Sequence, residues 1–311
     1  MNFQEQSQVF LASRTDRQRD PVKASTLVSY RSRLQNHILP ALGDLDIASF
    51  GNGAMKTFAK DLVRKGLAPK TVLETVNVVK LVVASAVSPD GDYLYPRQWN
   101  HEFIDLPRVA DQKQPTLTPE QLKAALADPA YGMFYALLAG TGLRIGEALA
   151  LRFGAISKKT AWTPTSAVLR VRTAICQNNG KEGLPKTPAA VRDIDLHPDL
   201  NVRLLEYVRD LGLSPTDEDF VFHSPKTGCT ALCESTIRKE SLKPLGIEGF
   251  HTFRRFRLTH LREQRVPEDI IRGWMGHAGA GVTDRYSKMM ENVELRKTWA
   301  EKAGLGFELN Q

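Results

Sequence analysis

Apolar residues recur at helical spacing in the first third of the chain, and this spacing predicts a small helical domain. One stretch of this kind begins after Ser25, a candidate N-cap. Two more cover residues 55–63 and 72–83. Residues 1–24 are polar and charged, and their pattern predicts an extension without firm secondary structure. We therefore expect a helical domain over residues 25–107.

A polar, proline-containing stretch separates this domain from the rest of the chain. Residues 108–118 hold few apolar side chains, which is typical of an interdomain linker. Thr118 precedes Pro119, and Gln121 lies three residues after Thr118, which is the pattern of a capping box at a helix start. A second, larger domain is therefore expected over residues 119–290.

The second domain combines helical patterns with short strands. Residues 144–153 have helical spacing, whereas apolar residues alternate with arginines over residues 169–173, which predicts a strand. A second short strand is expected at residues 194–196, and the chain beyond Asp199 returns to helical patterns. The predicted fold class is mainly α with a small β-sheet or hairpin, so the second domain is of the α+β type.

Composition agrees with a globular protein and indicates a polyanionic partner. The chain has 311 residues, of which 42% are hydrophobic and 25% charged, which excludes a collagenous, disulfide-scaffold or largely disordered protein. Lys and Arg number 42 against 35 Asp and Glu, so the net charge is +7. Residues 1–110 hold 14 Lys and Arg against 11 Asp and Glu, so both domains share the surplus. Such a surface favours nucleic acid.

Signals for metal binding, export and membrane insertion are weak. Cys176, Cys229 and Cys233 are too few for a disulfide framework, and with His223 they lack the second ligand pair of a structural zinc site. The N-terminus has no signal-peptide pattern, and the longest apolar stretch, residues 78–87, is interrupted by a lysine. We expect a cytoplasmic protein with no metal and no membrane partner.

Basic and polar residues of the second domain form four groups that could carry chemistry. Phosphate-loop and HExxH motifs are absent, and the glycine run over residues 140–146 departs from the dinucleotide fingerprint. The four groups contain Arg144 and Glu147, then Lys186, then His251 and Arg254, and finally His277 and Tyr286. The paired residues at i and i+3 share a helical face. Each residue alone has an ordinary structural explanation, and only their joint order indicates a function.

In order and spacing, these groups resemble the motifs of the tyrosine recombinases of the phage integrase type. The matching pieces are TGLRIGEAL around Arg144, the KT…R.I.L segment from Lys186, HTFR from His251 to Arg254, and GH at His277, with Tyr286 nine residues later and Thr283 three residues before that tyrosine. The segment STLVSYRSRLQNHILPALGDLDI is similar to the family's helical core-binding domain. The resemblance covers residues 25–286. The chain departs from the family pattern at Arg255, where His is frequent, and at Ala280, where a large apolar residue is common.

The resemblance implies a SAM-like core-binding domain followed by a DNA breaking-rejoining catalytic domain. Arginine suits a scissile phosphate because its guanidinium donates two parallel hydrogen bonds. The resemblance implies that Arg144 and Arg254 bind the phosphate, with a further hydrogen bond from His277. Tyr286 would be the nucleophile and His251 would accept its proton. Lys186, rather than the nearby Lys181, would protonate the leaving 5′ oxygen, and Glu147 would support its neighbours. The chemistry needs no metal and no cofactor.

The same resemblance implies a site-specific integrase that forms a 3′-phosphotyrosyl intermediate and exchanges strands through a Holliday junction. Its partners would be double-stranded DNA with paired half-sites, three further copies in a homotetramer, and accessory DNA-bending or directionality proteins. The tail, residues 291–311, carries an apolar stripe and either folds back on its own domain or docks on a neighbouring protomer. Candidate phosphate contacts of the first domain are Arg31, Arg33, Lys56, Lys60 and Lys70, together with Arg64 and Lys65.

Two other functions fit part of the pattern. A type IB topoisomerase shares the tyrosine chemistry, but the length, the first domain and the wording of the motifs favour a recombinase. A DNA-binding regulator without catalysis would keep the basic surface. The presence of all six residues that the resemblance selects as catalytic argues against that alternative.

Overall fold

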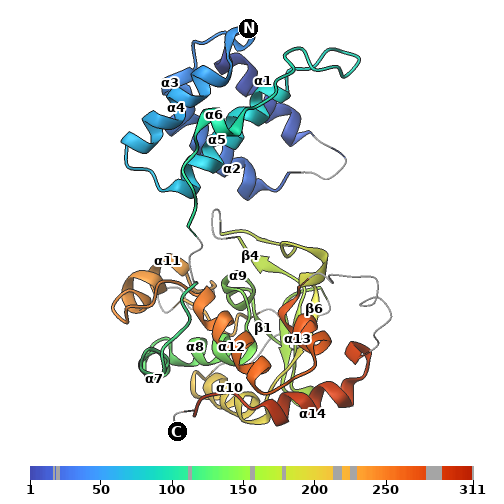
Figure 1. Cartoon of the computed structure of the whole chain (residues 1–311). Coiled ribbons are helices and arrows are strands. Elements are labelled where there is room, and N and C mark those ends of the chain that lie inside the picture. Colours follow the sequence, from blue (N-terminus) through green and yellow to red (C-terminus); the bar gives the residue numbers. More distant parts are fainter. Residues whose placement is uncertain are drawn as a thin grey trace. The chain divides into compact units, whose positions relative to one another are not determined.

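The computed structural model divides the chain into two compact units, residues 1–113 and 114–311. It describes residues 1–16, 18, 22–110, 114–154, 158–176, 180–212, 219–224, 230–277 and 289–309. The division between the units lies within the predicted linker, residues 108–118. Figure 1 shows the helices and strands of the two units. Each unit has its own hydrophobic core.

Unit 1 is built from helices. They are α1 (Phe3–Thr15), α2 (Ala24–Arg33), the π-helical turn η1 (Leu34–Ile38), α3 (Leu39–Leu42), the 3-10 turn η2 (Ile47–Ser49), α4 (Asn52–Arg64), α5 (Pro69–Ala84) and α6 (His101–Ile104). The helices α4 and α5 confirm the patterns at residues 55–63 and 72–83. The first predicted helix begins slightly earlier than expected, because Lys23 and not Ser25 is its N-cap.

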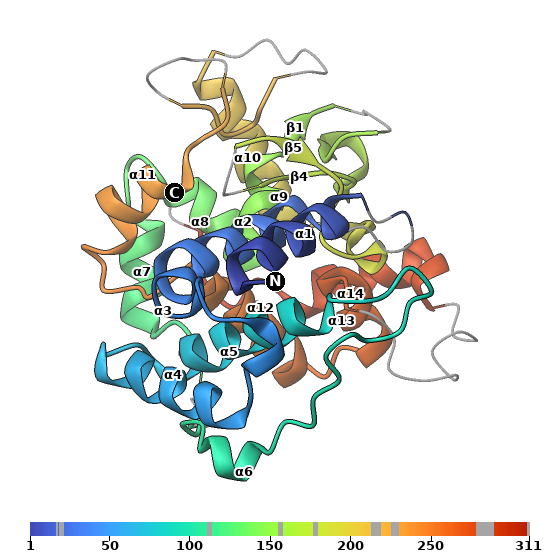
Figure 2. The same ribbon diagram turned by 90° about the horizontal axis from the view of Figure 1, so that it is seen from above.

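The expectation of an unstructured polar extension over residues 1–24 is wrong, because α1 occupies most of it. The Asn2 side chain accepts a 2.8 Å hydrogen bond from the Glu5 N–H, and the Glu5 carboxylate accepts one of 3.0 Å from the Asn2 N–H. This capping box holds the first turn. Phe3 and Phe10 are both fully buried, and α1 packs on α2 and α5 (Figure 2). The two aromatic residues and the partly buried Leu11 dock a helix whose other positions are mostly polar, so its average hydrophobicity gives little signal.

Unit 2 combines a helical core with two small sheets. Its helices are α7 (Pro119–Leu126), α8 (Gly132–Thr141), α9 (Ile145–Leu149), α10 (Pro198–Asp210), α11 (Glu234–Ile237), the π-helical turn η5 (Arg238–Leu242), α12 (His251–Glu263), α13 (Glu268–Met275) and α14 (Val293–Ala303). Shorter 3-10 turns are η3 (Pro164–Ser166), η4 (Pro188–Ala190) and η7 (Met289–Glu291). The predicted capping box is present, since the Gln121 N–H donates to the Thr118 hydroxyl over 3.2 Å.

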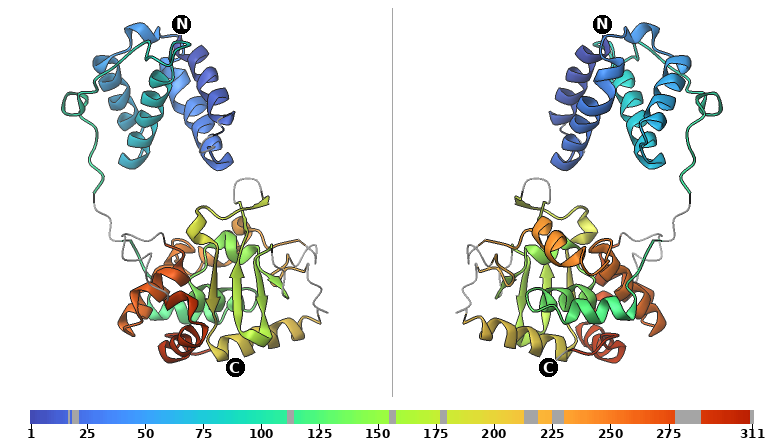
Figure 3. Two further views of the ribbon diagram at one scale, coloured as in Figure 1. Left: turned by 90° about the vertical axis from the view of Figure 1, so that its right-hand side faces the viewer. Right: turned by 90° about the vertical axis from the view of Figure 1, so that its left-hand side faces the viewer.

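The strands form one four-stranded sheet and one two-stranded ribbon (Figure 3). The strands are β1 (Arg152–Phe153), β2 (Ala161–Thr163), β3 (Val168–Val171), β4 (Ala174–Ile175), β5 (Glu182–Gly183) and β6 (Arg192–Asp195). The larger sheet has the order β1-β2-β3-β6, and β3 pairs antiparallel with β6. Both predicted strands are therefore present. The first ends at Val171, because Thr173 bonds to Thr160 through their backbone and hydroxyl groups instead of continuing the ladder.

The core of unit 2 is centred on α8 and α12, which pack against each other. Tyr135 of α8 stacks on Phe253 of α12 with ring centroids 5.1 Å apart and planes 2° apart. This contact fixes the start of α12. Within the described residues, no helix has the length and apolar character that crossing a bilayer requires.

The tail packs on its own unit in this structure. Ala300, Ala303 and Leu305 are buried in the core of unit 2. The buried guanidinium of Arg257 donates to the Gly304 carbonyl over 2.6 Å. The observed arrangement is thus the folded-back alternative, and exchange of the tail between protomers stays a prediction.

Candidate active site

Arg144 lies at the N-cap of α9, directly after a sharp helix end. The α8 helix stops at Gly142, whose φ of 70° is the left-handed conformation that glycine adopts without strain. The Arg144 N–H then donates to Glu147 over 3.0 Å, and its guanidinium donates to the same carboxylate over 3.0 Å. Arg144 also reaches the Gly276 carbonyl at 3.4 Å. Its side chain is 28% exposed, so it is the accessible arginine of the site.

Glu147 also binds a buried arginine that the sequence interpretation did not select. Arg192 of β6 donates to both carboxylate oxygens, over 3.1 and 2.8 Å, and further to the Trp274 carbonyl over 2.6 Å. Burial raises the pKa of Glu147, but the hydrogen bonds and charges of Arg192 and Arg144 outweigh it and hold that pKa below its usual value. A signal existed in the sequence, because strand alternation places residue 192 on the same face as the buried Ile194.

Arg254 and His277 meet at the C-terminal end of α13. Arg254 is 5% exposed and donates to the Gly142 carbonyl over 2.7 Å and to the Met275 carbonyl. The same guanidinium lies 3.1 Å from His277 Nε2. Because an arginine only donates, this nitrogen accepts, and the ring is then neutral. The pKa of His277 agrees with that state, since burial and then the charges of Arg254 and Arg144 lower it.

His251 begins α12, one turn before Arg254. Desolvation lowers its pKa first, and the charges of Arg254 and Arg255 lower it further. A neutral imidazole can accept a proton, which is what the resemblance expects of this residue. His251 and Arg255 also line a cavity of about 350 Å³, together with Gln114, Glu234 and Glu248 among others.

Arg255 stands where the family frequently has His, and its structural role was not evident from the sequence. Its guanidinium donates over 2.7 Å to the Pro115 carbonyl and over 2.7 Å to the Gln114 side chain. The residue that follows Arg254 therefore fastens the N-terminal end of unit 2 to α12. It thus stands beside the cluster of Arg144, Arg254 and His277 and makes its own contacts.

The site carries an excess of positive charge. Three guanidiniums, those of Arg144, Arg192 and Arg254, surround one carboxylate, that of Glu147. Burial and then the charges of Arg144 and Arg192 lower the pKa of Arg254 to about 9. At neutral pH Arg254 still stays protonated, so its neighbours repel it. A bound anion would relieve this repulsion, which makes the cluster a suitable phosphate site.

Two predicted catalytic residues are not part of this described cluster. Lys186 is exposed on the segment between β5 and β6, and Lys181 directly precedes β5. The choice of Lys186 over Lys181 as the catalytic lysine stays a prediction. Tyr286, Thr283 and Ala280 lie outside the described residues.

The predicted phosphate contacts of unit 1 differ in their surroundings. Arg33 pairs with Glu74, and the Lys56 ammonium lies 4.4 Å from the centre of the Phe103 ring. The remaining candidates, Arg31, Lys60, Arg64, Lys65 and Lys70, are exposed. Arg64 also pairs with Asp61 over 3.3 Å, but this pair is exposed, whereas the charges of Arg33 and Lys56 are engaged in less exposed contacts within the unit.

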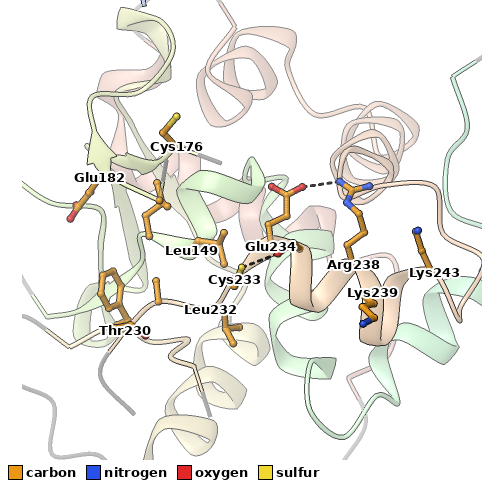
Figure 4. Close-up of a pocket in the computed structure, with 15 residues that line it drawn as sticks. Leu149, Cys176, Glu182, Thr230, Leu232, Cys233, Glu234, Arg238, Lys239 and Lys243 are labelled. Atoms are coloured by element: carbon orange, nitrogen blue, oxygen red, sulfur yellow. Dashed lines mark hydrogen bonds and ion pairs between the residues drawn. The ribbon is translucent and has the colours of Figure 1, made fainter. Parts of the chain in front are cut away.

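A larger cavity of about 760 Å³ lies between the β4–β5 ribbon and α11 (Figure 4). Its lining includes Cys176 and Cys233, both free thiols, and the Glu234–Arg238 ion pair of 2.8 Å. Of the predicted catalytic residues that the structure describes, none lines it. The described residues include no group of three or more His, Cys, Asp or Glu suited to hold a metal ion, and Cys229 lies outside them.

Comparison with known proteins places this geometry in context. No protein-family profile matches the chain. A "Tyrosine recombinase XerC-like" protein of Caldanaerobacter subterraneus subsp. tengcongensis is 23% identical, covering 84% of this chain and 73% of the relative. The Tn1549 transposon integrase in complex with a circular intermediate DNA has a TM-score of 0.71 at 18% identity, covering 94% of this chain and 99% of that one. A lambda integrase dimer bound to a COC′ core site has a TM-score of 0.58 at 14% identity, covering 100% and 99%.

The fold is that of the integrases, with a helical core-binding domain and a mainly helical catalytic domain that holds a small mixed sheet. In sequence, the chain is similar to the XerC-like tyrosine recombinase, and in fold to the Tn1549 and lambda integrases.

Proposed function

We propose that the protein is a site-specific DNA recombinase that cleaves and rejoins DNA strands through a 3′-phosphotyrosyl intermediate. The observation that carries this proposal is the convergence of Arg144, Arg254 and His277 at the end of α13, joined by the 3.1 Å contact between Arg254 and His277. This cluster offers guanidinium and imidazole groups to one anion. Its only described carboxylate, Glu147, is already paired with two arginines.

The proposed reaction is a transesterification at one phosphodiester. The Tyr286 oxygen attacks the phosphorus, the bond from phosphorus to the 5′ oxygen breaks, and a 3′-phosphotyrosyl bond forms. His251 accepts the tyrosine proton, and Lys186 gives a proton to the leaving 5′ oxygen. Rejoining reverses these steps with a 5′ hydroxyl from another strand, so the energy of the broken bond is conserved.

Arginine charge supplies the main stabilisation in this scheme. Negative charge builds up on the non-bridging oxygens in the transition state, and preorganised donors aimed at those oxygens lower the barrier. Arg144 is accessible, and Glu147 fixes its backbone and its guanidinium. Arg254 is held by two backbone carbonyls, so little reorganisation is needed when phosphate arrives.

Solved structures of lambda integrase support a proposal for the assembly. Lambda integrase has been solved as a dimer on a core site and as a tetramer bound to a Holliday junction; the latter has a TM-score of 0.57 at 14% identity. We propose that this chain likewise forms a homotetramer on paired half-sites and exchanges strands through such a junction. Accessory DNA-bending or directionality proteins would set the outcome. An enzyme of this kind would act on bacterial or phage DNA in the cytoplasm.

The experiment that tests the proposal begins by selecting the DNA site with the protein itself from a random-sequence duplex library. A duplex carrying the selected half-sites, nicked close to the expected cleavage position, then traps the intermediate because the short fragment diffuses away. A covalent protein–DNA adduct that survives denaturation supports the proposal. Sequence-selective binding without any adduct would favour the regulator that has lost catalysis.

The same preparation separates the topoisomerase alternative. Relaxation of supercoiled plasmid that lacks the selected site would favour a type IB topoisomerase. A recombinase should instead join two site-bearing duplexes and leave site-free plasmid supercoiled.

A further inference from the structure

One buried carboxylate of β6 holds two helices of unit 2 together. Asp195 has a side chain that is only 1% exposed. Its Oδ2 accepts a 3.0 Å hydrogen bond from the Trp274 indole N–H of α13 and a 2.7 Å bond from Arg296 Nε of α14. Its Oδ1 lies 3.3 Å from a second nitrogen of Arg296. Both oxygens are thus used by donors from two different helices.

The contacts of Trp274 and Arg296 extend this cluster to the neighbouring backbone. The Trp274 carbonyl accepts from Arg192, the same arginine that binds Glu147, so β6 holds Trp274 by both its backbone and its side chain. Arg296, with a side chain 9% exposed, donates from a third nitrogen to the Met290 carbonyl. The described parts of α13, η7 and α14 therefore share one buried set of hydrogen bonds centred on Asp195.

Side-chain packing also brings η7 and α13 together. Met290 of η7 lies against Gly273 of α13, and a Cβ at position 273 would lie 2.8 Å from Met290 Cγ. A side chain at position 273 would therefore force the Met290 side chain to move. In the sequence, Trp274 precedes His277 by three residues, and Met290 follows Tyr286 by four. The positions that Asp195 holds are thus those immediately before and after the part of the chain that carries the proposed nucleophile.

We propose that Asp195 is a positioning residue for strand cleavage, acting through Trp274 and Arg296; this inference rests on the proposed function. Its carboxylate fixes the end of α13, where His277 and the Met275 carbonyl meet Arg254. Through Arg296 it also fixes the Met290 carbonyl and the first turns of α14. Loss of its charge leaves a buried guanidinium without its counter-ion, which the cluster can relieve only by letting α14 or the end of α13 move.

The test compares variants that remove one charge of the buried pair at a time, and Asp195→Asn also keeps the shape of the side chain. Asp195→Asn can still accept from Trp274 but sets an amide N–H against the guanidinium, and Arg296→Gln removes the opposite charge. On the nicked duplex with the selected half-sites, each single variant should slow single-turnover cleavage about tenfold or more, as expected for misplaced groups. DNA affinity and the final yield of adduct should stay near wild type. The double variant, neutral on both sides, should recover part of the rate.

A control variant breaks an exposed ion pair that touches neither helix. Arg203 and Glu206 form a 3.0 Å ion pair on α10, with side chains about 40% exposed. The Glu206→Gln variant should cleave at the wild-type rate. Trp274→Phe removes only the indole N–H and should give a smaller slowing, which keeps the proposal testable if Asp195→Asn does not fold.

Two outcomes would overturn the proposal. One is a cleavage rate for Asp195→Asn within twofold of wild type. The other is a lower adduct yield at an unchanged rate, which means a smaller folded fraction and a merely structural role. Amide hydrogen exchange of the free protein gives an independent readout, because Asp195→Asn should speed exchange in residues 270–277 and 289–296 and leave α7 unchanged. If wild-type protein forms no adduct, the proposed function fails, and unchanged exchange at these residues would separately refute the anchoring.

Discussion

Arg192 of β6 binds both carboxylate oxygens of Glu147, and the two side chains are 4% and 2% exposed. This pair connects the sheet to the N-cap of α9, where Glu147 also holds Arg144. Removing one partner of a buried pair leaves the other charge without compensation, which costs about 3–5 kcal/mol. We expect Arg192→Met to lower the free energy of unfolding by that amount in urea titrations. The exposed pair of Arg203 and Glu206 is the control, and its loss should cost about 0–1 kcal/mol. Equal losses for the two pairs would contradict this assignment.

The histidines of the site should make stability depend on pH. The pKa values of His251 and His277 are lowered in the folded protein, mainly by desolvation and then by nearby arginines. As the pH falls below about 6.5, the unfolded chain therefore takes up protons before the folded one, and stability declines. We expect Tm to fall between pH 7 and pH 5. The fall should be smaller in a variant with both residues changed to Gln, and an unchanged pH slope would argue against lowered pKa values.

The stability of a tail-deletion variant should show whether the tail packs on its own unit or is exchanged between protomers. If residues 304–311 pack on their own unit, their deletion removes buried Leu305 and takes the Gly304 carbonyl from buried Arg257. We expect a loss of about 2–4 kcal/mol in the free energy of unfolding, equal at low and high protein concentration. If the tail is instead exchanged between protomers, the deletion should leave the dilute monomer unchanged and weaken assembly on paired sites in a gel-shift assay.

Exposed lysines of unit 1 should contribute to DNA affinity through phosphates. Lys60 and Lys70 are exposed, whereas Lys56 lies over the Phe103 ring and Arg33 pairs with Glu74. Removal of one lysine that binds a phosphate should lower the slope of log affinity against log salt by about 1. We expect this change for Lys60→Ala and Lys70→Ala. The control is Lys297→Ala, an exposed lysine of α14, which should leave the slope unchanged. The same slope for all three variants and wild type would show that these lysines do not bind DNA phosphates.

The sequence was informative where a local signal decides the structure. The capping box at Thr118 and the strand alternation around Leu169 depend on neighbouring residues, and both are present. The helix α1 was missed because its stability comes from two aromatic anchors that pack against other helices. The buried contacts of Asp195 were missed for a similar reason, since its partners Trp274 and Arg296 are distant in sequence and meet it only after α13 and α14 have packed on the sheet.

The residues of the candidate site also differ in how far the structure bears on their selection from the sequence. Resemblance selected Arg144, Arg254 and His277, which the structure brings together around the end of α13. It also selected Glu147 as a support, and the structure shows what that residue supports. Lys186 and Tyr286 rest on motif order alone, because one lies on an exposed segment and the other lies outside the described residues.

The central claim is that Tyr286 attacks a phosphodiester held by the arginine cluster. The most direct measurement is peptide mass mapping of the covalent adduct formed on the nicked duplex, with Tyr286→Phe as the paired variant. We expect the nucleotide on the peptide that contains Tyr286, and no adduct from Tyr286→Phe at unchanged DNA affinity. An adduct of equal yield from the Phe variant, or a nucleotide on another residue, would contradict the account.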